Sequence, residues 1–166
     1  MSTKVAAAAV VVTALLAATG VGAAPSREHA GCTIMGSARS ENLYGTPGRD
    51  VICGLGGHDY IVGAGGNDRI LGGGGDDRID GGIGADVVLG EAGNDIVDGS
   101  DGADTVDGGV GGDWVTGGLG RDVHRGGPGN DHVISRDGGQ DLVDGGPGID
   151  RAWVDGPYDR VTSIEQ

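Results

Sequence analysis

The chain has 166 residues, of which 39 are glycine and 5 are proline, and it contains no phenylalanine. Because proline is scarce and no Gly-x-y triplet persists, a collagen-like triple helix is excluded. Large apolar side chains are too few for a conventional globular core, since glycine loses the most backbone entropy on folding. The formal charge of −14, with arginines scattered singly, argues against nucleic acid and anionic membranes as partners and favours cations.

Residues 1–24 have the features of a cleavable secretory signal peptide. Lys4 precedes an apolar stretch at residues 5–18, and small residues follow up to Ala24. A transmembrane helix is the alternative, but this stretch is shorter than the ~20 residues that cross a bilayer. Cleavage after Ala23 or Ala24 would leave residues 25–35 as an N-terminal lead-in. We therefore expect a secreted, extracellular protein with no membrane insertion after cleavage.

Cys32 and Cys53 are the only cysteines of the chain. An exported protein meets an oxidising environment, so we predict a disulfide between them. A bridge closing a loop of this size contributes ~3 kcal/mol in the chain-entropy model. Free thiols and metal ligation are the alternatives, although no second cysteine pair or Cys–His cluster completes a zinc site.

Aspartate recurs every nine residues from Asp50 to Asp131 without a break. One extra residue near Ser135 then shifts the phase, and Arg136–Asp137 replaces the leading glycines of the next unit. In a unit such as 72–80, position one is glycine, position four is usually glycine, position six is aspartate and position eight is apolar. A degenerate unit at 36–44 places Glu41 at position six and is expected to cap the start.

The position-eight residues are mostly β-branched, which favours short strands over positions seven to nine. They are Ile52, Ile61, Ile70, Ile79, Val88, Val97, Val106, Val115, His124, Val133, Val143, Ala152 and Val161. Side chains alternate along a strand, so position eight faces an interior while positions seven and nine face solvent. We predict an all-β solenoid of stacked coils at 36–153, each coil made of two units, and a C-terminal cap at 154–166.

Stacking the coils in register would bring the position-six aspartates of each side into a column spaced by ~4.8 Å. Cations between the coils would remove the repulsion, and the hard oxygen donors of flexible turns suit Ca²⁺. The alternative is that these aspartates only cap the turns by accepting backbone N–H groups. The predicted Ca²⁺ ligands are Asp50, Asp59, Asp68, Asp77, Asp86, Asp95, Asp104, Asp113, Asp122, Asp131, Asp141 and Asp150.

The repeated motif Gly-Gly-x-Gly-x-Asp-x-U-x, as in residues 72–80 and 81–89, resembles that of the hemolysin-type calcium-binding (RTX) family. The resemblance implies a right-handed parallel β-roll. It also implies Ca²⁺ ions between adjacent turns, bound by position-six carboxylates and turn carbonyls, and this transfers best to Asp59 through Asp131. Toxins and proteases of this family generally leave the cell through an uncleaved C-terminal signal, whereas this chain begins with a cleavable one. We expect several Ca²⁺ ions as cofactors and folding on binding.

No catalytic constellation stands out, because His58, His124 and His132 lie in different units without an HExxH motif. We expect a calcium-binding module and no enzyme. The alternative is a Ca²⁺-dependent adhesin or cell-envelope and matrix module whose outward face binds a glycan, cell wall or protein. The outward position-seven residues show no repeated chemistry that would favour it: Tyr60, Arg78, Ile96, Trp114 and His132.

Overall fold

A computed structural model describes residues 31–164, and every regular element among these residues is a strand. The strands are β1 (Ile34–Met35), β2 (Asn42–Tyr44), β3 (Val51–Cys53), β4 (Tyr60–Val62), β5 (Arg69–Gly74), β6 (Arg78–Asp80), β7 (Val87–Ala92), β8 (Ile96–Asp98), β9 (Asp101–Gly102), β10 (Thr105–Asp107), β11 (Trp114–Thr116), β12 (Leu119–Gly120), β13 (Val123–Arg125), β14 (His132–Ser135), β15 (Leu142–Asp144), β16 (Arg151–Val154) and β17 (Arg160–Thr162). Residues 31–164 contain no helix long and apolar enough to span a membrane. The predicted signal peptide at 1–24 lies outside the described residues.

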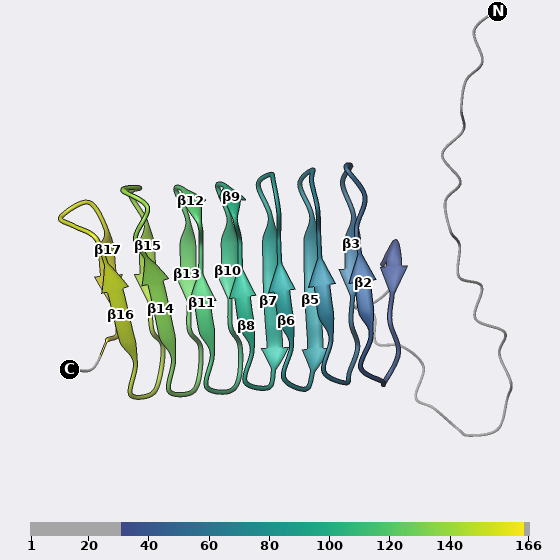
Figure 1. Cartoon of the computed structure of the whole chain (residues 1–166). Coiled ribbons are helices and arrows are strands. Elements are labelled where there is room, and N and C mark those ends of the chain that lie inside the picture. The colour runs from purple at the N-terminus through teal and green to yellow at the C-terminus, as the bar shows by residue number, and fades with distance from the viewer. Residues whose placement is uncertain (1–30, 165–166) are drawn as a thin grey trace, which may run out of the picture.

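The strands form two parallel sheets that run the length of the molecule (Figure 1). Sheet A has eight strands in the order β1-β3-β5-β7-β10-β13-β15-β17, and sheet B has seven in the order β16-β14-β11-β8-β6-β4-β2. A small pair, β9 and β12, forms where two turns stack. Because the chain passes alternately between sheets A and B, each coil adds one strand to each sheet. The predicted parallel β-roll is therefore confirmed.

The register shows that one coil equals two nine-residue units. Ile52 of β3 pairs with Ile70 of β5, and Ile61 of β4 pairs with Ile79 of β6. After the phase shift, His124 pairs with Val143, one residue further along than the regular spacing. Both sheets continue through this point, so the extra residue is accommodated in the turn between β14 and β15.

The interior is formed by the position-eight side chains of both sheets, as the periodicity predicts. The core cluster consists of residues exposed by 1% or less: Ile52, Ile61, Ile70, Ile79, Val88, Val97, Val106, Val115, Val133 and Val143. Leu43 and Ala152 are partly buried at the two ends of the sheet B row, and Ile34 is partly buried at the N-terminal end of the sheet A row. His124 occupies an interior position and is 1% exposed. Because each nine-residue unit contributes one aliphatic side chain to this thin interior, the roll forms without phenylalanine.

Position two of the unit requires a left-handed backbone, which explains part of the glycine content. Gly73 has a φ of 108° and Gly82 a φ of 98°. Where position two is not glycine, the backbone is still in the left-handed region, with φ of 75° at Leu55 and at Glu91. A residue with a Cβ is strained in this region, so the turn geometry is set by the stacking of coils and not by local preference.

The prediction that position nine faces solvent is wrong at the N-terminal end of sheet A. Cys53 and Leu71 both occupy position nine and pair with each other in the register of β3 and β5. They are only 0% and 3% exposed. Cys53 is bridged to Cys32 on this outer face, so an outward direction does not ensure exposure here.

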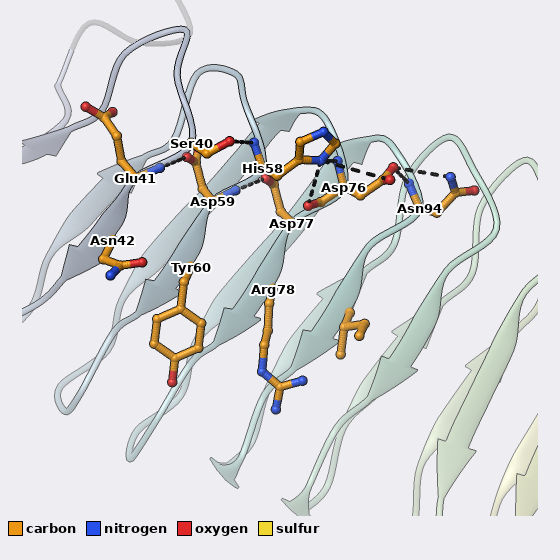
Figure 2. Close-up of a pocket in the computed structure, with 11 residues that line it drawn as sticks. Ser40, Glu41, Asn42, His58, Asp59, Tyr60, Asp76, Asp77, Arg78 and Asn94 are labelled. Carbon is orange, nitrogen blue, oxygen red and sulfur yellow. Dashed lines mark hydrogen bonds and ion pairs between the residues drawn. The ribbon is translucent and has the colours of Figure 1, made fainter.

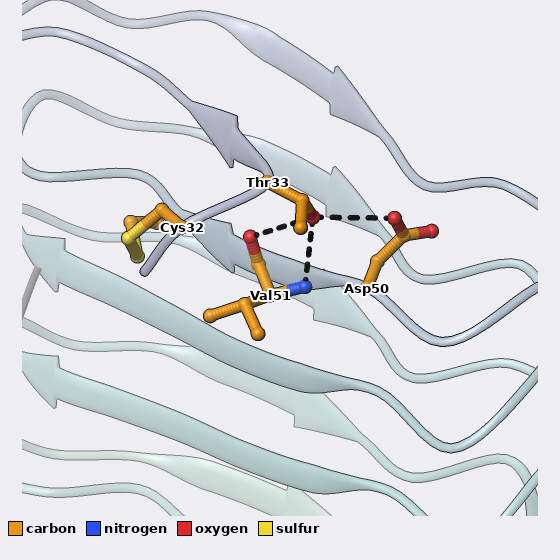
Figure 3. Close-up of a disulfide and its surroundings, with 5 residues drawn as sticks. Cys32, Thr33, Asp50 and Val51 are labelled. Carbon is orange, nitrogen blue, oxygen red and sulfur yellow. Dashed lines mark hydrogen bonds between the residues drawn. A yellow bond between two sulfur atoms is a disulfide. The ribbon is translucent and has the colours of Figure 1, made fainter. Parts of the chain in front are cut away.

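The predicted disulfide fixes the lead-in to the first coil of sheet A (Figure 3). Cys32 and Cys53 have Cα atoms 6.1 Å apart. The next residue, Thr33, accepts a 2.9 Å hydrogen bond from the N–H of Val51 and donates one of 3.2 Å to Oδ1 of Asp50. The edge of the sheet is therefore closed by a covalent bond and a hydroxyl group.

Candidate metal centre

The position-six residues form two columns, because each precedes a strand and the strands are in register. Column A precedes the strands of sheet A and contains Asp50, Asp68, Asp86, Asp104, Asp122, Asp141 and Asp159. Column B precedes the strands of sheet B and contains Glu41, Asp59, Asp77, Asp95, Asp113, Asp131 and Asp150. The tertiary structure thus brings together the predicted ligands of each side.

In every position-six aspartate except Asp50, one carboxylate oxygen accepts a hydrogen bond from the backbone of the neighbouring coil (Figure 2). The N–H of Glu41 donates a 2.8 Å hydrogen bond to Oδ1 of Asp59, and the N–H of Asp59 donates one of 2.7 Å to Oδ1 of Asp77. The same bond recurs along both columns, for example from Asp95 to Asp113. The capping alternative therefore describes one oxygen correctly, but the cap joins two coils and does not close a turn.

The other carboxylate oxygen has no such partner. Ten position-six aspartates bury an Oδ2 atom that makes no hydrogen bond within residues 31–164: Asp59, Asp68, Asp77, Asp86, Asp95, Asp104, Asp113, Asp122, Asp131 and Asp150. Burying a charged oxygen without compensation is costly, so each of these atoms requires a cation or a proton.

The pKa values of these carboxyl groups also reflect the cost of burying their charge. Burial raises the pKa of Asp95 and of Asp104 to about 7. Burial also raises the pKa of Asp77 and of Asp131 to about 6. Neighbouring aspartates of the same column raise these pKa values further, while the backbone N–H bonds lower them. Near neutral pH, the columns can therefore take up either protons or metal cations.

Backbone carbonyl oxygens lie beside the free carboxylate oxygens at position one. A Cβ added to Gly72 would lie 2.7 Å from Oδ2 of Asp77 and 2.7 Å from the carbonyl oxygen of Gly90. A Cβ added to Gly108 would lie 2.6 Å from Oδ2 of Asp113 and 2.7 Å from the carbonyl oxygen of a glycine one coil on. Each such glycine leaves a space lined by carboxylate and carbonyl oxygens, which are the donors that Ca²⁺ prefers.

Two of the predicted ligands lack the free oxygen. Asp50 accepts hydrogen bonds at Oδ2 from the N–H and the hydroxyl group of Thr46, at 2.7 and 2.8 Å. Asp141 accepts a 2.6 Å hydrogen bond at Oδ2 from the hydroxyl group of Ser135. These two aspartates are at the N-terminal end of column A and just after the phase shift. The hydroxyl residues look like ordinary turn residues in the sequence, so the period could not reveal this difference.

One additional carboxylate joins column A at the phase shift. Asp122, Asp137 and Asp141 each offer an oxygen, and these three oxygens lie within 4.8 Å of one another. Asp137 is absent from the predicted ligands because it does not follow the nine-residue period. Only the turn made by the extra residue carries its side chain to the column.

A family model describing the RTX calcium-binding nonapeptide repeat matches the chain in four copies, at residues 35–70, 62–97, 98–133 and 116–152. The chain belongs to this RTX repeat family. The matches span residues 35–152, more than two thirds of the RTX chain, and include every predicted Ca²⁺ ligand. The RTX β-roll is a structural calcium-binding fold. No curated protein matches this RTX chain.

Proposed function

We propose that the protein is a secreted calcium-binding module that binds several Ca²⁺ ions along columns A and B and folds when they bind. The observation that carries this proposal is the row of buried Oδ2 atoms without a hydrogen-bond partner among the described residues. Bound Ca²⁺ would supply the positive charge that these carboxylates require. The position-six aspartates from Asp59 to Asp131 and the neighbouring position-one carbonyl oxygens would hold the ions.

The donor set favours Ca²⁺ over other divalent cations. Ca²⁺ takes six to eight oxygen ligands in flexible geometry, whereas Mg²⁺ demands a near-ideal octahedron and keeps several waters. Stacked turns that offer carboxylate and carbonyl oxygens at every coil match the first requirement. We therefore expect Mg²⁺ at equal concentration to replace Ca²⁺ poorly.

Folding on binding follows from the thin interior and the charge of the columns. With millimolar external Ca²⁺ and a dissociation constant near 0.1 mM, each site stabilises the fold by ~1.4 kcal/mol. Several such sites together reach the free energy of unfolding of an ordinary domain, ~5–15 kcal/mol. Without cations, the columns retain buried carboxylates with no counter-charge, so we expect the Ca²⁺-free chain to be largely unfolded.

Secretion is supported by two independent features. The disulfide between Cys32 and Cys53 fits an oxidising compartment outside the cytosol. The N-terminal sequence has the charge and apolar pattern of a signal peptide. External Ca²⁺ would then be the signal that completes folding after export.

Circular dichroism and calorimetry of the purified protein test the proposal. In chelator we expect a spectrum of unfolded chain, and in millimolar Ca²⁺ a β spectrum with several ions bound per chain. Mg²⁺ at the same concentration is the control and should give little β structure. A β spectrum in chelator that does not change on adding Ca²⁺, together with no heat of binding, would overturn the proposal.

A second candidate function is Ca²⁺-dependent attachment to a glycan, and it is favoured by one observation. On the outer face of sheet B, the rings of Trp114 and His132 stack with centroids 4.4 Å apart and planes 3° apart. The ring of Trp153 lies 5.3 Å from that of His132. Trp114 is 47% and Trp153 39% exposed. Two position-seven residues, Trp114 and His132, which look unrelated in the sequence, thus form a stack of rings with Trp153.

This second candidate is tested by tryptophan fluorescence in Ca²⁺ with soluble cell-wall polysaccharides. For the wild-type protein we expect a saturable change in fluorescence. The double variant Trp114→Ala, Trp153→Ala lacks both fluorophores, so its binding is measured by polysaccharide depletion. We expect this variant to have lost binding. Tyr158→Ala is the control, since Tyr158 is 66% exposed and lies outside the stack. Equal depletion by the double variant and the control would exclude the stack as the attachment site.

A further inference from the structure

The two turns at the N-terminal end of the roll provide partners for their own position-six carboxylates. The N–H of Ser37 donates a 2.6 Å hydrogen bond to Oε2 of Glu41. In the next turn, Oδ2 of Asp50 accepts hydrogen bonds from the N–H and the hydroxyl group of Thr46, at 2.7 and 2.8 Å. In both turns the donor is at position two and the acceptor at position six of the same unit. We call these closed turns, because their carboxylates are satisfied without a cation.

The backbone at position two distinguishes the closed turns from those that follow. Ser37 and Thr46 do not have a positive φ, whereas φ is 75° at Leu55 and 77° at Ala64, which hold position two in the next two units. It stays positive at this position as far as Gly127. In the units that begin at 54 and 63, the position-six Oδ2 is buried and has no hydrogen-bond partner among residues 31–164. The buried Oδ2 atoms without partners thus begin where the backbone of the turn changes.

Both closed turns lie within the loop that the disulfide closes. The bridge between Cys32 and Cys53 encloses β1, β2 and β3, and we call this segment the N-terminal coil (residues 32–53). Within it, Ile34 of β1 pairs with Ile52 of β3. A bridge lowers the conformational entropy of the unfolded chain inside its loop, so it favours order in this segment before any ion binds.

The coil at the phase shift has only one of these features. There the hydroxyl group of Ser135 donates a 2.6 Å hydrogen bond to Oδ2 of Asp141, which satisfies one carboxylate of column A. In column B, the preceding Asp131 and the following Asp150 each bury an Oδ2 without a hydrogen-bond partner among residues 31–164. Within the described roll, the N-terminal coil is therefore the one in which the carboxylates of both columns are satisfied by the protein itself.

The hydrogen bonds that join the coils along each column have a direction. The backbone N–H at position six donates to Oδ1 of the residue one coil later, as from Glu41 to Asp59 (Figure 2) and from Asp50 to Asp68, both at 2.8 Å. Asp59 and Asp68 are the first residues of their columns whose Oδ2 has no partner among the described residues. An ordered coil thus orients the carboxylates of the coil that follows it, and not those of the coil before it.

We propose that the N-terminal coil orders without Ca²⁺ and is the template on which the Ca²⁺-binding coils assemble, one after another toward the C-terminus. This rests on the folding on Ca²⁺ binding proposed above, and it adds the starting point and the direction. Formation of the disulfide and binding of Ca²⁺ would then act in sequence, because the reduced chain lacks the template. Since the N-terminal coil is a small part of the chain, the circular dichroism spectrum in chelator remains that of a largely unfolded protein.

Amide hydrogen exchange of the full chain, followed by mass spectrometry at increasing Ca²⁺, tests this order. In chelator, with the disulfide intact, we expect residues 33–53 to exchange more slowly than an unfolded chain by about tenfold or more, and residues 60–162 to exchange at the unfolded rate. As Ca²⁺ is added, protection should appear in β4–β8 before it appears in β13–β17. Reducing the disulfide of the wild-type protein in chelator should remove the protection of residues 33–53.

Two glycine substitutions at position two of successive column A turns test the closed turn itself. Thr46→Gly removes the hydroxyl bond to Asp50 and permits a positive φ, so it should lower the protection of residues 33–53 in chelator by about fivefold or more. Ala64→Gly is the matched control, because Ala64 already has a φ of 77° that glycine adopts without strain, and it should leave this protection unchanged. Circular dichroism in saturating Ca²⁺ should show the wild-type β spectrum for both variants.

The possible outcomes separate this proposal from the calcium function. The template would be overturned if residues 33–53 exchanged at the unfolded rate in chelator while all coils were protected in Ca²⁺, or if protection began at the C-terminal coils. Protection of residues 33–53 that survives both reduction of the disulfide and Thr46→Gly would also overturn it. If Thr46→Gly does not fold in Ca²⁺, the reduction of wild-type protein decides. Protection of every coil in chelator would instead overturn folding on Ca²⁺ binding, and with it the order of assembly.

Discussion

Asp77 accepts a 2.7 Å hydrogen bond at Oδ1 from the backbone N–H of Asp59, eighteen residues earlier, while its buried Oδ2 has no partner among the described residues. The two oxygens of one carboxylate therefore differ, because one joins neighbouring coils and the other is available for the proposed Ca²⁺ ion. Serine or asparagine at position six could supply the first oxygen but not the second charge. This explains why the nine-residue period selects aspartate.

Replacing a column aspartate by asparagine should separate these two roles. In Asp95→Asn, the amide oxygen can still accept the N–H of Asp77, but the charged Oδ2 is lost. We expect Ca²⁺ binding at the affected step to weaken about tenfold, or about 1.4 kcal/mol, in a calorimetric titration. Asp101→Asn, at an exposed residue of the short strand β9, removes the same charge outside the columns and is the control. Equal effects of both variants would show that only net charge matters.

The pH dependence should have opposite signs without and with Ca²⁺. Burial raises the pKa of Asp95 and Asp104 from 3.8 to about 7, so the folded state holds these protons more tightly than the unfolded state. Their contribution to stability is fully present below about pH 4 and is lost as the pH rises through about 7. In chelator, acidification from pH 8 to 5 should therefore increase β structure in circular dichroism. Ca²⁺ affinity should fall over the same interval, because protons compete for the carboxylates, and a pH-independent affinity would contradict the burial argument.

Two glycines at the C-terminal end of β5, Gly72 and Gly74, should respond differently to alanine. A Cβ at Gly72 would lie 2.7 Å from Oδ2 of Asp77 and from the carbonyl oxygen of Gly90, whereas a Cβ at Gly74 would meet nothing within 4 Å. We expect Gly72→Ala to lower the free energy of unfolding in Ca²⁺ by about 1–3 kcal/mol. Gly74→Ala should leave it unchanged or raise it by up to about 1 kcal/mol. Thermal unfolding of both variants in Ca²⁺ checks this, and similar losses would show that glycine is needed for flexibility alone.

Removing the disulfide should destabilise the N-terminal end of the roll. The double variant Cys32→Ala, Cys53→Ala avoids a free thiol and should lose about 3 kcal/mol, since the bridge closes a loop of 21 residues. Because the edge strand β1 pairs with β3, amide hydrogen exchange should rise first in residues 33–53. Wild-type protein treated with a reductant in Ca²⁺ should behave like the double variant. If amide hydrogen exchange instead rose uniformly along the whole roll, the bridge would stabilise the entire roll and not only its N-terminal end.

The nine-residue period determined the architecture, the interior residues and the two aspartate columns. Strand alternation and in-register stacking allow few other ways to fold such a sequence. The bridge between Cys32 and Cys53 was predicted separately, from the signal-like N-terminus and the presence of only two cysteines. The period could not predict that Asp50 and Asp141 are satisfied by hydroxyl groups, since Thr46 and Ser135 reach them only through the local path of the turns. Side-chain contacts of this kind, four and six residues apart, are not repeated from unit to unit and carry no periodic signal.

The sequence by itself determined which residues are equivalent, because equivalence follows from position in the repeat. Only the tertiary structure decided which of these equivalent residues differ in their contacts. Stacking brings the outward Trp114 and His132 into contact, and the extra residue of the phase shift carries Asp137 to Asp122 and Asp141. The physical reason is that neighbours across coils are set by register and turn path, which a single residue can change without altering the period on either side.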